Sequence, residues 1–261
     1  MKLSFTTLGC PDWDLGQMID GALSSGFDGI DLRGSSGEME LWRVAEFSDE
    51  QRLAQTAARL RAAGLEVPCV SSSGRLLVDG EEQRAESLDN LRRFAEIGGA
   101  LGAKFVRVFG GFAGERPHAT AVREAAEMLD TMAAAAAEFG VTVLVETHDD
   151  WEATDKLREV LDAGGCSNGR LGLADCCRDS DCRLLLRTAT APNIGAVWDI
   201  NHPYRRHQEA PETSWRNLAP HIMYVHVKDS YMNEADEQEH AMIGDGEHTA
   251  DWLRVGLRVH A

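Results

Sequence analysis

Three apolar segments of the sequence each end in side chains that can bind a metal ion or move a proton. These are Glu146 and His148 after Val143–Val145, Asp199 and His202 after Ala196–Trp198, and His226, Lys228 and Asp229 after Met223–Val225. A continuous apolar, β-branched run is typical of a strand buried in a parallel sheet. In an α/β barrel the carboxyl ends of such strands meet at one rim, which holds the active site. The spacing therefore predicts a site of oxygen and nitrogen ligands at that rim.

The elements that must position these residues alternate between strands and helices along the chain. The predicted strands are Lys2–Thr6, Gly29–Arg33, Glu66–Ser71, Phe105–Phe109, Val141–Glu146, Ile194–Asp199 and Ile222–Val227. The predicted helices are Leu15–Ser25, a helix with Ser48 as its N-cap that runs to about Ala63, Glu81–Leu101, His118–Phe139, Ala153–Ala163, Glu212–Leu218 and a last helix from Thr249 to Arg258. Regular alternation of this kind predicts a parallel sheet with crossover helices.

The seven strand–helix units favour an α/β fold of the (β/α)8 TIM-barrel type over an open sheet. The glycine-rich motifs of dinucleotide and nucleotide folds are missing. Because the sequence stops at Ala261 after the last predicted helix, we expect a barrel that lacks its eighth strand. An unclosed barrel exposes strand edges. We therefore expect either a longer native chain, or an edge that is covered by a second subunit or by the insertion before the sixth strand.

That insertion, residues 164–191, separates the fifth predicted helix from the sixth predicted strand. Connections between a helix and a strand usually take about two to six residues, so this segment is far longer than a normal loop. It contains Cys166, Cys176, Cys177 and Cys182. These cysteines lack the Cys-x2-Cys pairs that are usual in zinc sites. We favour a flexible insertion with free thiols over a structural metal site, and a redox role stays open.

The length and composition fit one barrel-sized domain, residues 1–261. A formal net charge of −17 works against binding to nucleic acid, because proteins grip a phosphate backbone with Lys and Arg. The charge does not exclude a small anionic sugar. The sequence has no apolar run of about 18 residues and no signal-peptide core, so we expect no membrane span and a cytoplasmic location.

Several motifs resemble those of one enzyme family. They are Gly26–Arg33 (GFDGIDLR), Val145–His148 (VETH), Trp198–Pro203 (WDINHP), His226–Asp229 (HVKD), Gly244–Glu247 (GDGE) and Trp252. Together they resemble the sugar phosphate isomerase/epimerase family, the xylose-isomerase-like TIM barrels that are related to apurinic-site endonucleases. The resemblance covers nearly the whole chain, and it is specific for the superfamily rather than for a substrate.

The resemblance implies that Glu146, Asp199 and His226 hold a divalent cation. It also implies that Glu146 is one of two carboxylates that move a proton at the carbon next to the carbonyl, and that His202 contacts the substrate. In the family a Glu at the end of strand 8 is the fourth ligand and the second proton-moving carboxylate. That residue has no counterpart in this sequence, and Glu247 is the acid of the terminal motif that we consider as its replacement.

The donor atoms lead to a similar chemistry by a separate argument. A mixed oxygen and nitrogen site with few thiolates suits Mn²⁺, Mg²⁺, Co²⁺ or Zn²⁺, and carboxylates favour the harder ions. Such an ion would polarise a carbonyl as a Lewis acid, and a nearby carboxylate would remove the proton. Each residue also has a structural alternative. Glu146 would then be an ion-pair partner, Asp199 a turn cap and His226 a hydrogen-bonded core histidine.

Four further residues are predicted to contact the substrate: His148, Lys228, Asp229 and Arg33. His148 shares the turn after the fifth strand with Glu146, and Arg33 ends the second strand. For Lys228 and Asp229 the alternative is a solvated pair of charges at the rim.

We expect a divalent-metal-dependent isomerase or epimerase that acts on a sugar or sugar phosphate by proton transfer next to a carbonyl. A lyase or dehydratase of the inosose or dehydroshikimate type would use the same metal and base in a different pocket. An apurinic-site endonuclease is disfavoured, because it needs further histidine ligands, which Phe109 does not supply, and a basic groove. A catalytically impaired scaffold is the alternative raised by the missing strand-8 Glu. The expected partner is a small-molecule sugar, and we expect no nucleic acid or membrane and consider a homo-oligomer.

Overall fold

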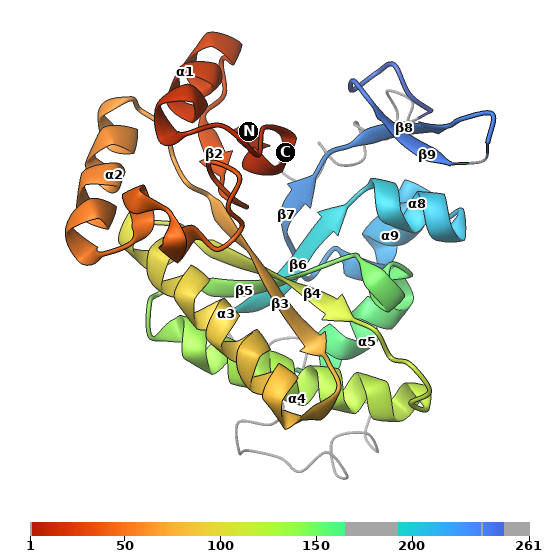
Figure 1. Ribbon diagram of the computed structural model, residues 1–261. Coiled ribbons are helices and arrows are strands. Elements are labelled where there is room, and N and C mark those ends of the chain that lie inside the picture. The colour runs from red at the N-terminus through yellow and green to blue at the C-terminus, as the bar shows by residue number, and fades with distance from the viewer. Residues whose placement is uncertain (1, 165–192, 236, 248–261) are drawn as a thin grey trace. The chain divides into compact units, whose positions relative to one another are not determined.

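The computed structural model describes residues 2–164, 193–235 and 237–247 (Figure 1). Its strands are β1 (Ser4–Thr6), β2 (Gly29–Asp31), β3 (Cys69–Leu77), β4 (Phe105–Gly111), β5 (Thr142–Glu146), β6 (Ile194–Asp199), β7 (Ile222–His226), β8 (Asp229–Met232) and β9 (Gln238–Ala241). Its α-helices are α1 (Leu15–Ser25), α2 (Glu50–Ala62), α3 (Gly80–Leu101), α4 (His118–Ala137), α5 (Thr154–Ala163), α8 (Asn201–His207) and α9 (Pro211–Leu218). Short 3-10 helices occupy Thr7–Gly9, Leu41–Arg43, Ala45–Phe47 and Asp149–Trp151.

The parallel strands follow one another in the order of the sequence. β1 pairs with β2 in parallel, and a five-stranded parallel sheet has the order β3-β4-β5-β6-β7. Isolated parallel bridges join Gly29 to Glu66 and Leu32 to Val70. Consecutive parallel strands with helical crossovers are the arrangement of (β/α) barrels, so the predicted α/β fold of the TIM-barrel type is confirmed. Within the described residues, the strand that follows β7 belongs to the antiparallel pair β8–β9.

The predicted bounds of the first helix and of the sixth strand agree with α1 and β6. α1 begins with a capping box, in which the Asp14 side chain accepts from Gln17 N and the Gln17 side chain accepts from Asp14 N. It ends at Gly26, whose φ of 73° lies in the left-handed region that glycine adopts without strain. Start and stop signals of this kind are local, which is why the sequence predicts the helix well.

The predicted N-cap of the next helix is wrong by one residue. Asp49 caps α2, and its Oδ1 accepts a hydrogen bond from Arg52 N at 2.9 Å. Ser48 instead ends the preceding 3-10 helix, and its hydroxyl donates to Ala45 O. Ser and Asp cap helices about equally well, so the local sequence does not distinguish these neighbours and the preceding turn decides.

Contacts within the chain divide it into two compact units. Unit 1 comprises Met1–Gly74, Asp79–Val108 and Thr131–Val143, and unit 2 comprises Arg75–Val78, Phe109–Asp130 and Leu144–Ala261. In unit 1, α2 packs against α3, and the core contains the fully buried Leu91 and Phe94. In unit 2, α5 packs against α9 and β6, and the core contains Trp151 and Trp198. Gly110 is required beside Trp151, because a Cβ there would lie 2.0 Å from the ring.

Two predicted segments lie outside the described residues. They are all but the first residue of the insertion, with Cys166, Cys176, Cys177 and Cys182, and the helix expected from Thr249 to Arg258. Cys10 and Cys69 are free thiols, and only Cys69 of these two is buried. No helix in the described part of the chain combines the length and apolar character needed to cross a membrane.

Candidate metal centre and active site

Glu146, Asp199 and His226 are the last residues of β5, β6 and β7, and all three belong to unit 2. β6 and β7 pair in parallel with Asp199 opposite His226. Beside them, Thr147 N, directly after β5, donates to Val197 O in β6 at 3.1 Å. This register sets the carboxyl ends of the three strands level with one another. As a result, one ligand atom of each side chain lies within 4.8 Å of the other two.

The acids of this group are buried to a degree that is unusual for charged side chains. The Asp199 side chain is 0% exposed and that of Glu146 is 4% exposed. His226 Nδ1 lies 3.1 Å from Glu146 Oε1. Because an ionised carboxylate only accepts hydrogen bonds, Nδ1 carries the proton and Nε2 keeps the lone pair that a metal ligand needs. Carboxylates are almost never buried unless positive charge or hydrogen bonds compensate them, so the surroundings of this group must stabilise its negative charge.

The two oxygens of Asp199 have different surroundings. Oδ1 accepts a hydrogen bond from Asn201 N at 2.9 Å, which caps the turn into α8. Oδ2 accepts no hydrogen bond of normal geometry from the described residues, although Lys228 Nζ lies 2.7 Å away. The lysine contact is therefore an ion pair rather than a well-directed hydrogen bond. Oδ2 therefore meets a cation more readily than Oδ1, which already accepts a backbone hydrogen bond.

His202 follows Asp199 by one helical turn and lies in α8. Its Nδ1 donates to Thr147 O at 2.8 Å, so Nε2 keeps its lone pair and accepts from Lys228 Nζ at 3.3 Å. Burial lowers the pKa of His202 below its usual range; the charge of Asp199 opposes this, and the charge of Lys228 adds to it. The imidazole is thus held neutral, with one nitrogen facing the lysine.

Thr147 is a buried residue that the sequence patterns do not single out. Its hydroxyl accepts from Asp199 N at 2.9 Å and donates to Asp199 O at 3.1 Å. These two bonds fasten the end of β5 to the end of β6. Thr147 therefore sets the spacing between Glu146 and Asp199. The only sequence signal for this role is its place directly after Glu146, which is too common to predict it.

A row of rings continues from His202 along the strand ends of unit 2. The His148 ring packs against His202 at a centroid distance of 4.7 Å and against Phe109 at 4.6 Å. The Arg75 guanidinium lies over the Phe109 ring, 5.9 Å from its centroid. The structure thus brings the predicted His148 next to the predicted His202, and it adds Phe109 and Arg75, which the sequence patterns do not predict as site residues.

Asp149 orients His148 and is a further residue that the sequence patterns miss. Its Oδ1 lies 2.7 Å from His148 Nδ1, and its Oδ2 accepts from Gly111 N at 3.1 Å. Burial raises the pKa of Asp149. The pKa is lowered by the hydrogen bond with His148, by the charges of His148 and Arg75, and by the hydrogen bond from Gly111. Together these four effects outweigh burial, so the net shift of the pKa is downward. The φ of Asp149 is 56°, a left-handed conformation that Asp tolerates better than most residues. Backbone strain of this kind is often kept at functional sites.

Asp229 and Glu247 hold the hairpin that follows β7. Asp229 is buried, and its Oδ2 accepts from Gly244 N at 2.8 Å and from Gly246 N at 3.1 Å. A Cβ on Gly246 would lie 2.1 Å from Asp229 Oδ1, which explains the glycine in the terminal motif. Glu247 pairs with Arg205 at 2.6 Å. Among the described residues Glu247 does not join the ligand group, and substrate contact by Asp229 stays a prediction.

Arg33 lies in unit 1, and its local contacts are structural. Its Nη2 donates to Ser73 Oγ at 3.0 Å, and its backbone N–H donates to Thr7 Oγ1 at 2.9 Å. Substrate contact by Arg33 stays a prediction.

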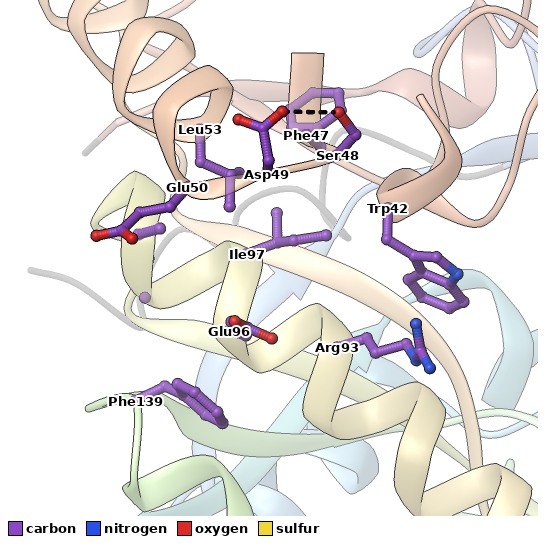
Figure 2. A pocket seen from close by; sticks show the side chains of 12 residues that line it. Trp42, Phe47, Ser48, Asp49, Glu50, Leu53, Arg93, Glu96, Ile97 and Phe139 are labelled. Carbon is purple, nitrogen blue, oxygen red and sulfur yellow. Dashed lines mark hydrogen bonds between the residues drawn. The ribbon is translucent and has the colours of Figure 1, made fainter. Parts of the chain in front are cut away.

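A surface groove of unit 1 contains none of the predicted site residues. Figure 2 shows it between α2, α3 and the preceding 3-10 helices, where Arg93 lies over the Trp42 ring at 5.1 Å from the centroid. The residues that line it include Phe47, Leu53 and Ile97. Its lining has no cluster of acids and imidazoles like the one at the ends of β5, β6 and β7.

The donor set of Glu146, Asp199 and His226 fits a divalent cation. It offers carboxylate oxygens, an imidazole nitrogen and a buried Oδ2 on Asp199 that accepts no well-directed hydrogen bond among the described residues. Lys228 Nζ lies 2.7 Å from the buried carboxylate of Asp199, and His226 lies beside that of Glu146. Oxygen-rich sites with one imidazole are typical of Mn²⁺, Mg²⁺, Co²⁺ or Zn²⁺.

Solved structures with the same fold include enzymes of several kinds. The probable 3-DHS dehydratase AsbF of Bacillus anthracis is 16% identical, with a TM-score of 0.74 over 100% of this chain and 90% of its own. The IOLI protein with a binding zinc atom is 15% identical, with a TM-score of 0.74 over 100% of this chain and 86% of its own. The 3-keto-D-glucoside 4-epimerase YcjR of E. coli is 14% identical, with a TM-score of 0.69 over 99% of this chain and 88% of its own.

None of the curated proteins matches this sequence significantly. The family model described as xylose isomerase-like TIM barrel matches residues 19–258. That span includes every strand from β2 to β9 and the whole ligand group. The chain therefore belongs to the xylose isomerase-like TIM barrel family.

Proposed function

We propose that this protein is a divalent-metal-dependent isomerase or epimerase that moves a proton next to the carbonyl of a sugar or sugar phosphate. The observation that carries the proposal is the meeting of Glu146, Asp199 and His226 within 4.8 Å at the ends of three neighbouring strands. Membership of the xylose isomerase-like TIM barrel family supports it, as does the similarity in fold to a sugar epimerase.

Glu146, Asp199 and His226 would hold the cation through carboxylate oxygens and an imidazole nitrogen. When bound, the cation supplies Lewis-acid polarisation of a carbonyl and a neighbouring hydroxyl. The carboxylates favour the harder ions among Mn²⁺, Mg²⁺, Co²⁺ and Zn²⁺. One structure of similar fold, the IOLI protein, is described with a binding zinc atom, which supports a metal-binding role for this fold.

The chain's own residues divide the remaining tasks. Glu146 would accept the proton from the substrate carbon as a general base. Lys228 would donate to a substrate oxygen, and His202, which accepts from Lys228 through Nε2, would contact the substrate with its ring. The His148 and Phe109 rings pack at an interplanar angle of 52°, and the apolar face of a sugar ring would pack against one of them. Asp229 and Arg33 are kept as proposed substrate contacts without a specific role.

A dehydratase is the second candidate, and the similarity to a probable 3-DHS dehydratase favours it. Elimination of water would begin with the same proton removal by Glu146 and would end with loss of a hydroxyl. The impaired scaffold is the third candidate, because no fourth acid joins the ligand group among the described residues. The cytoplasmic location and the homo-oligomer stay predictions.

Exchange of the substrate proton with solvent deuterium distinguishes these candidates. The metal-loaded protein is incubated in D₂O with a panel of ketoses, ketose phosphates and dehydroshikimate, and proton NMR follows deuterium at the carbon next to the carbonyl. We expect exchange by the wild type, and a fall of about 10²–10⁴-fold for Glu146→Gln. The control is Glu159→Gln, an exposed carboxylate in α5 that pairs with His118.

Three outcomes are decisive. Exchange with a ketose that is lost in Glu146→Gln supports the isomerase or epimerase. Exchange coupled to loss of a hydroxyl from dehydroshikimate replaces it with the dehydratase. An absence of exchange with every compound, with the metal bound, contradicts both and leaves the scaffold.

A further inference from the structure

Lys228 reaches back into the candidate metal centre from just beyond the end of β7. It follows His226 by two residues, and its side chain is 29% exposed. Its Nζ lies 2.7 Å from Asp199 Oδ2. The lysine and the proposed metal ion would therefore bind the same carboxylate. The Asp199 side chain itself is not exposed to solvent.

The carboxylate of Asp199 cannot easily share these two cations. Its Oδ1 is engaged by Asn201 N at 2.9 Å, so Oδ2 is the oxygen that a cation approaches. An ammonium 2.7 Å from Oδ2 takes up one of the lone-pair directions of that oxygen. Two positive charges at one oxygen repel each other strongly where water is excluded. Lys228 in this position thus opposes metal binding at Asp199, and its withdrawal favours it.

Lys228 has a second partner that keeps it at the site after it leaves Asp199. His202 Nε2 lies 3.3 Å from Nζ and is an acceptor, because Nδ1 of the same ring donates to Thr147 O. The lysine side chain is partly exposed, whereas Asp199 is buried. A withdrawn ammonium would thus stay beside His202, on the solvent side of the ligand group, where an incoming negatively charged oxygen can meet it.

We propose that Lys228 competes with the metal ion for Asp199 and, once displaced, binds a negatively charged oxygen of the substrate. Metal binding and binding of an anionic ligand are then coupled positively. Each makes the other tighter by the same factor, as thermodynamic linkage requires. This inference rests on the metal site of the proposed function and adds to it a coupling between the metal and the substrate.

The first test is the affinity for Mn²⁺ alone, measured by isothermal titration calorimetry at pH 7. Lys228→Met removes the competing charge and keeps much of the length of the side chain. We expect it to bind Mn²⁺ about tenfold more tightly than the wild type, a difference of about 1.4 kcal/mol. Lys228→Arg keeps the positive charge and should bind Mn²⁺ as weakly as the wild type or more weakly. Lys156→Met, the same change at an exposed position of α5, should have no effect.

The second test is the coupling with glycolate, a small hydroxy acid that offers an anionic oxygen next to a hydroxyl. Free Mn²⁺ is measured by electron paramagnetic resonance with and without a fixed glycolate concentration, and a protein-free sample corrects for complexes in solution. We expect glycolate to tighten Mn²⁺ binding by about tenfold in the wild type, within the usual range for coupled sites. In Lys228→Met the factor should fall to about twofold or less.

Thermal unfolding with and without Mn²⁺ separates an effect of Lys228→Met on metal binding from an effect on stability. Without metal, the buried carboxylate of Asp199 loses its ion pair in this variant. The variant should therefore have a lower melting temperature than the wild type. With Mn²⁺ the difference should close, because the ion replaces the missing charge. Lys228→Gln serves as a second neutral variant.

Failure of this inference differs from failure of the proposed function. If Asp199→Asn abolishes Mn²⁺ binding while Lys228→Met binds as the wild type does or more weakly, the metal site stands and the competition is wrong. If Asp199→Asn binds Mn²⁺ as the wild type does, the metal site itself is wrong, and the inference fails with it.

Discussion

The buried charged side chains of unit 1 and of unit 2 have different partners. In unit 1, Asp31 at the end of β2 accepts from Ser71 Oγ at 2.9 Å, and Arg107 donates to Ser72 O at 2.7 Å. In unit 2, Asp199 is in contact with Lys228, and its ligand atom lies within 4.8 Å of those of Glu146 and His226.

The difference shows what separates a structural charge from a candidate catalytic one. Among the contacts described above, Asp31 and Arg107 bond to neutral groups, a hydroxyl and a backbone carbonyl. In unit 2, Asp199 contacts the ammonium of Lys228, and ligand-type atoms of Glu146 and His226 lie within 4.8 Å of that carboxylate. Burial alone therefore does not identify the site, because Asp31 and Asp199 are both almost completely buried.

The largest expected effect compares these two aspartates. Asp199→Asn should lower the affinity for Zn²⁺ or Mn²⁺ by more than about 100-fold, since even partners of metal ligands contribute about 10–100-fold. Asp31→Asn should leave the affinity unchanged. Calorimetric titration of both variants checks this. An equal loss of metal affinity in the two variants would contradict this prediction. It would mean that the affinity falls because the fold is destabilised and not because a ligand is lost.

The next effect compares two buried threonines, Thr147 in unit 2 and Thr7 in unit 1. The Thr7 hydroxyl donates to Gly34 O at 2.8 Å and accepts from Arg33 N at 2.9 Å, much as Thr147 bonds to Asp199. Valine at either position should reduce the free energy of unfolding by about 1–3 kcal/mol, because it leaves backbone groups without their partner. Only Thr147→Val should also weaken metal binding, by about tenfold.

Urea denaturation and calorimetric titration on both threonine variants separate the two roles. Metal binding that weakens equally in Thr7→Val would remove the distinction between the units.

A smaller effect concerns the glycine that supports the hairpin of unit 2. In Gly246→Ala the new Cβ would lie 2.1 Å from Asp229 Oδ1, and such overpacking costs about 1–3 kcal/mol. In unit 1, a Cβ on Gly9 would meet nothing within 4 Å, so Gly9→Ala should leave the stability nearly unchanged. Urea denaturation measures both. A Gly246→Ala variant as stable as the wild type would contradict the described loop geometry.

The smallest effect concerns the charge of Asp149. Its pKa is lowered in the folded protein, so its ionised form stabilises the fold above the usual pKa of about 3.9, and this contribution is lost as the pH falls through the lowered value. Asp149→Asn should cost about 1 kcal/mol at pH 7, and the difference from the wild type should shrink below about pH 4. Asp155→Asn, an exposed change in α5, is the control. A difference that grows at low pH would contradict the sign of the shift.

The sequence predicts the parts of this protein that depend on neighbours along the chain. The bounds of α1 follow from Asp14 and Gly26, and the bounds of β6 follow from one apolar run that ends in Asp199. The order of the strands then implies that Glu146, Asp199 and His226 share one edge of the sheet. The motifs add the expected donor types, so the ligand group could be predicted before any coordinates.

The remainder depends on contacts between distant residues. Lys228 meets Asp199, and Asp229 meets Gly244, only because the chain folds back after β7. The left-handed Asp149 has no distinct sequence signal, because Asp is equally common in ordinary turns. The sequence does not predict α8 because Pro203 breaks the interior of a helix. Proline is tolerated in the first turn, which is where Pro203 lies.

A crystal structure of the protein loaded with Zn²⁺, with anomalous diffraction measured at the zinc edge, tests the central claim most directly. The account predicts one strong anomalous peak about 2.0–2.2 Å from ligand atoms of Glu146, Asp199 and His226, with Lys228 Nζ withdrawn from Asp199 Oδ2. Under saturating Zn²⁺, a peak elsewhere, or no peak while Lys228 stays on Asp199, would contradict it.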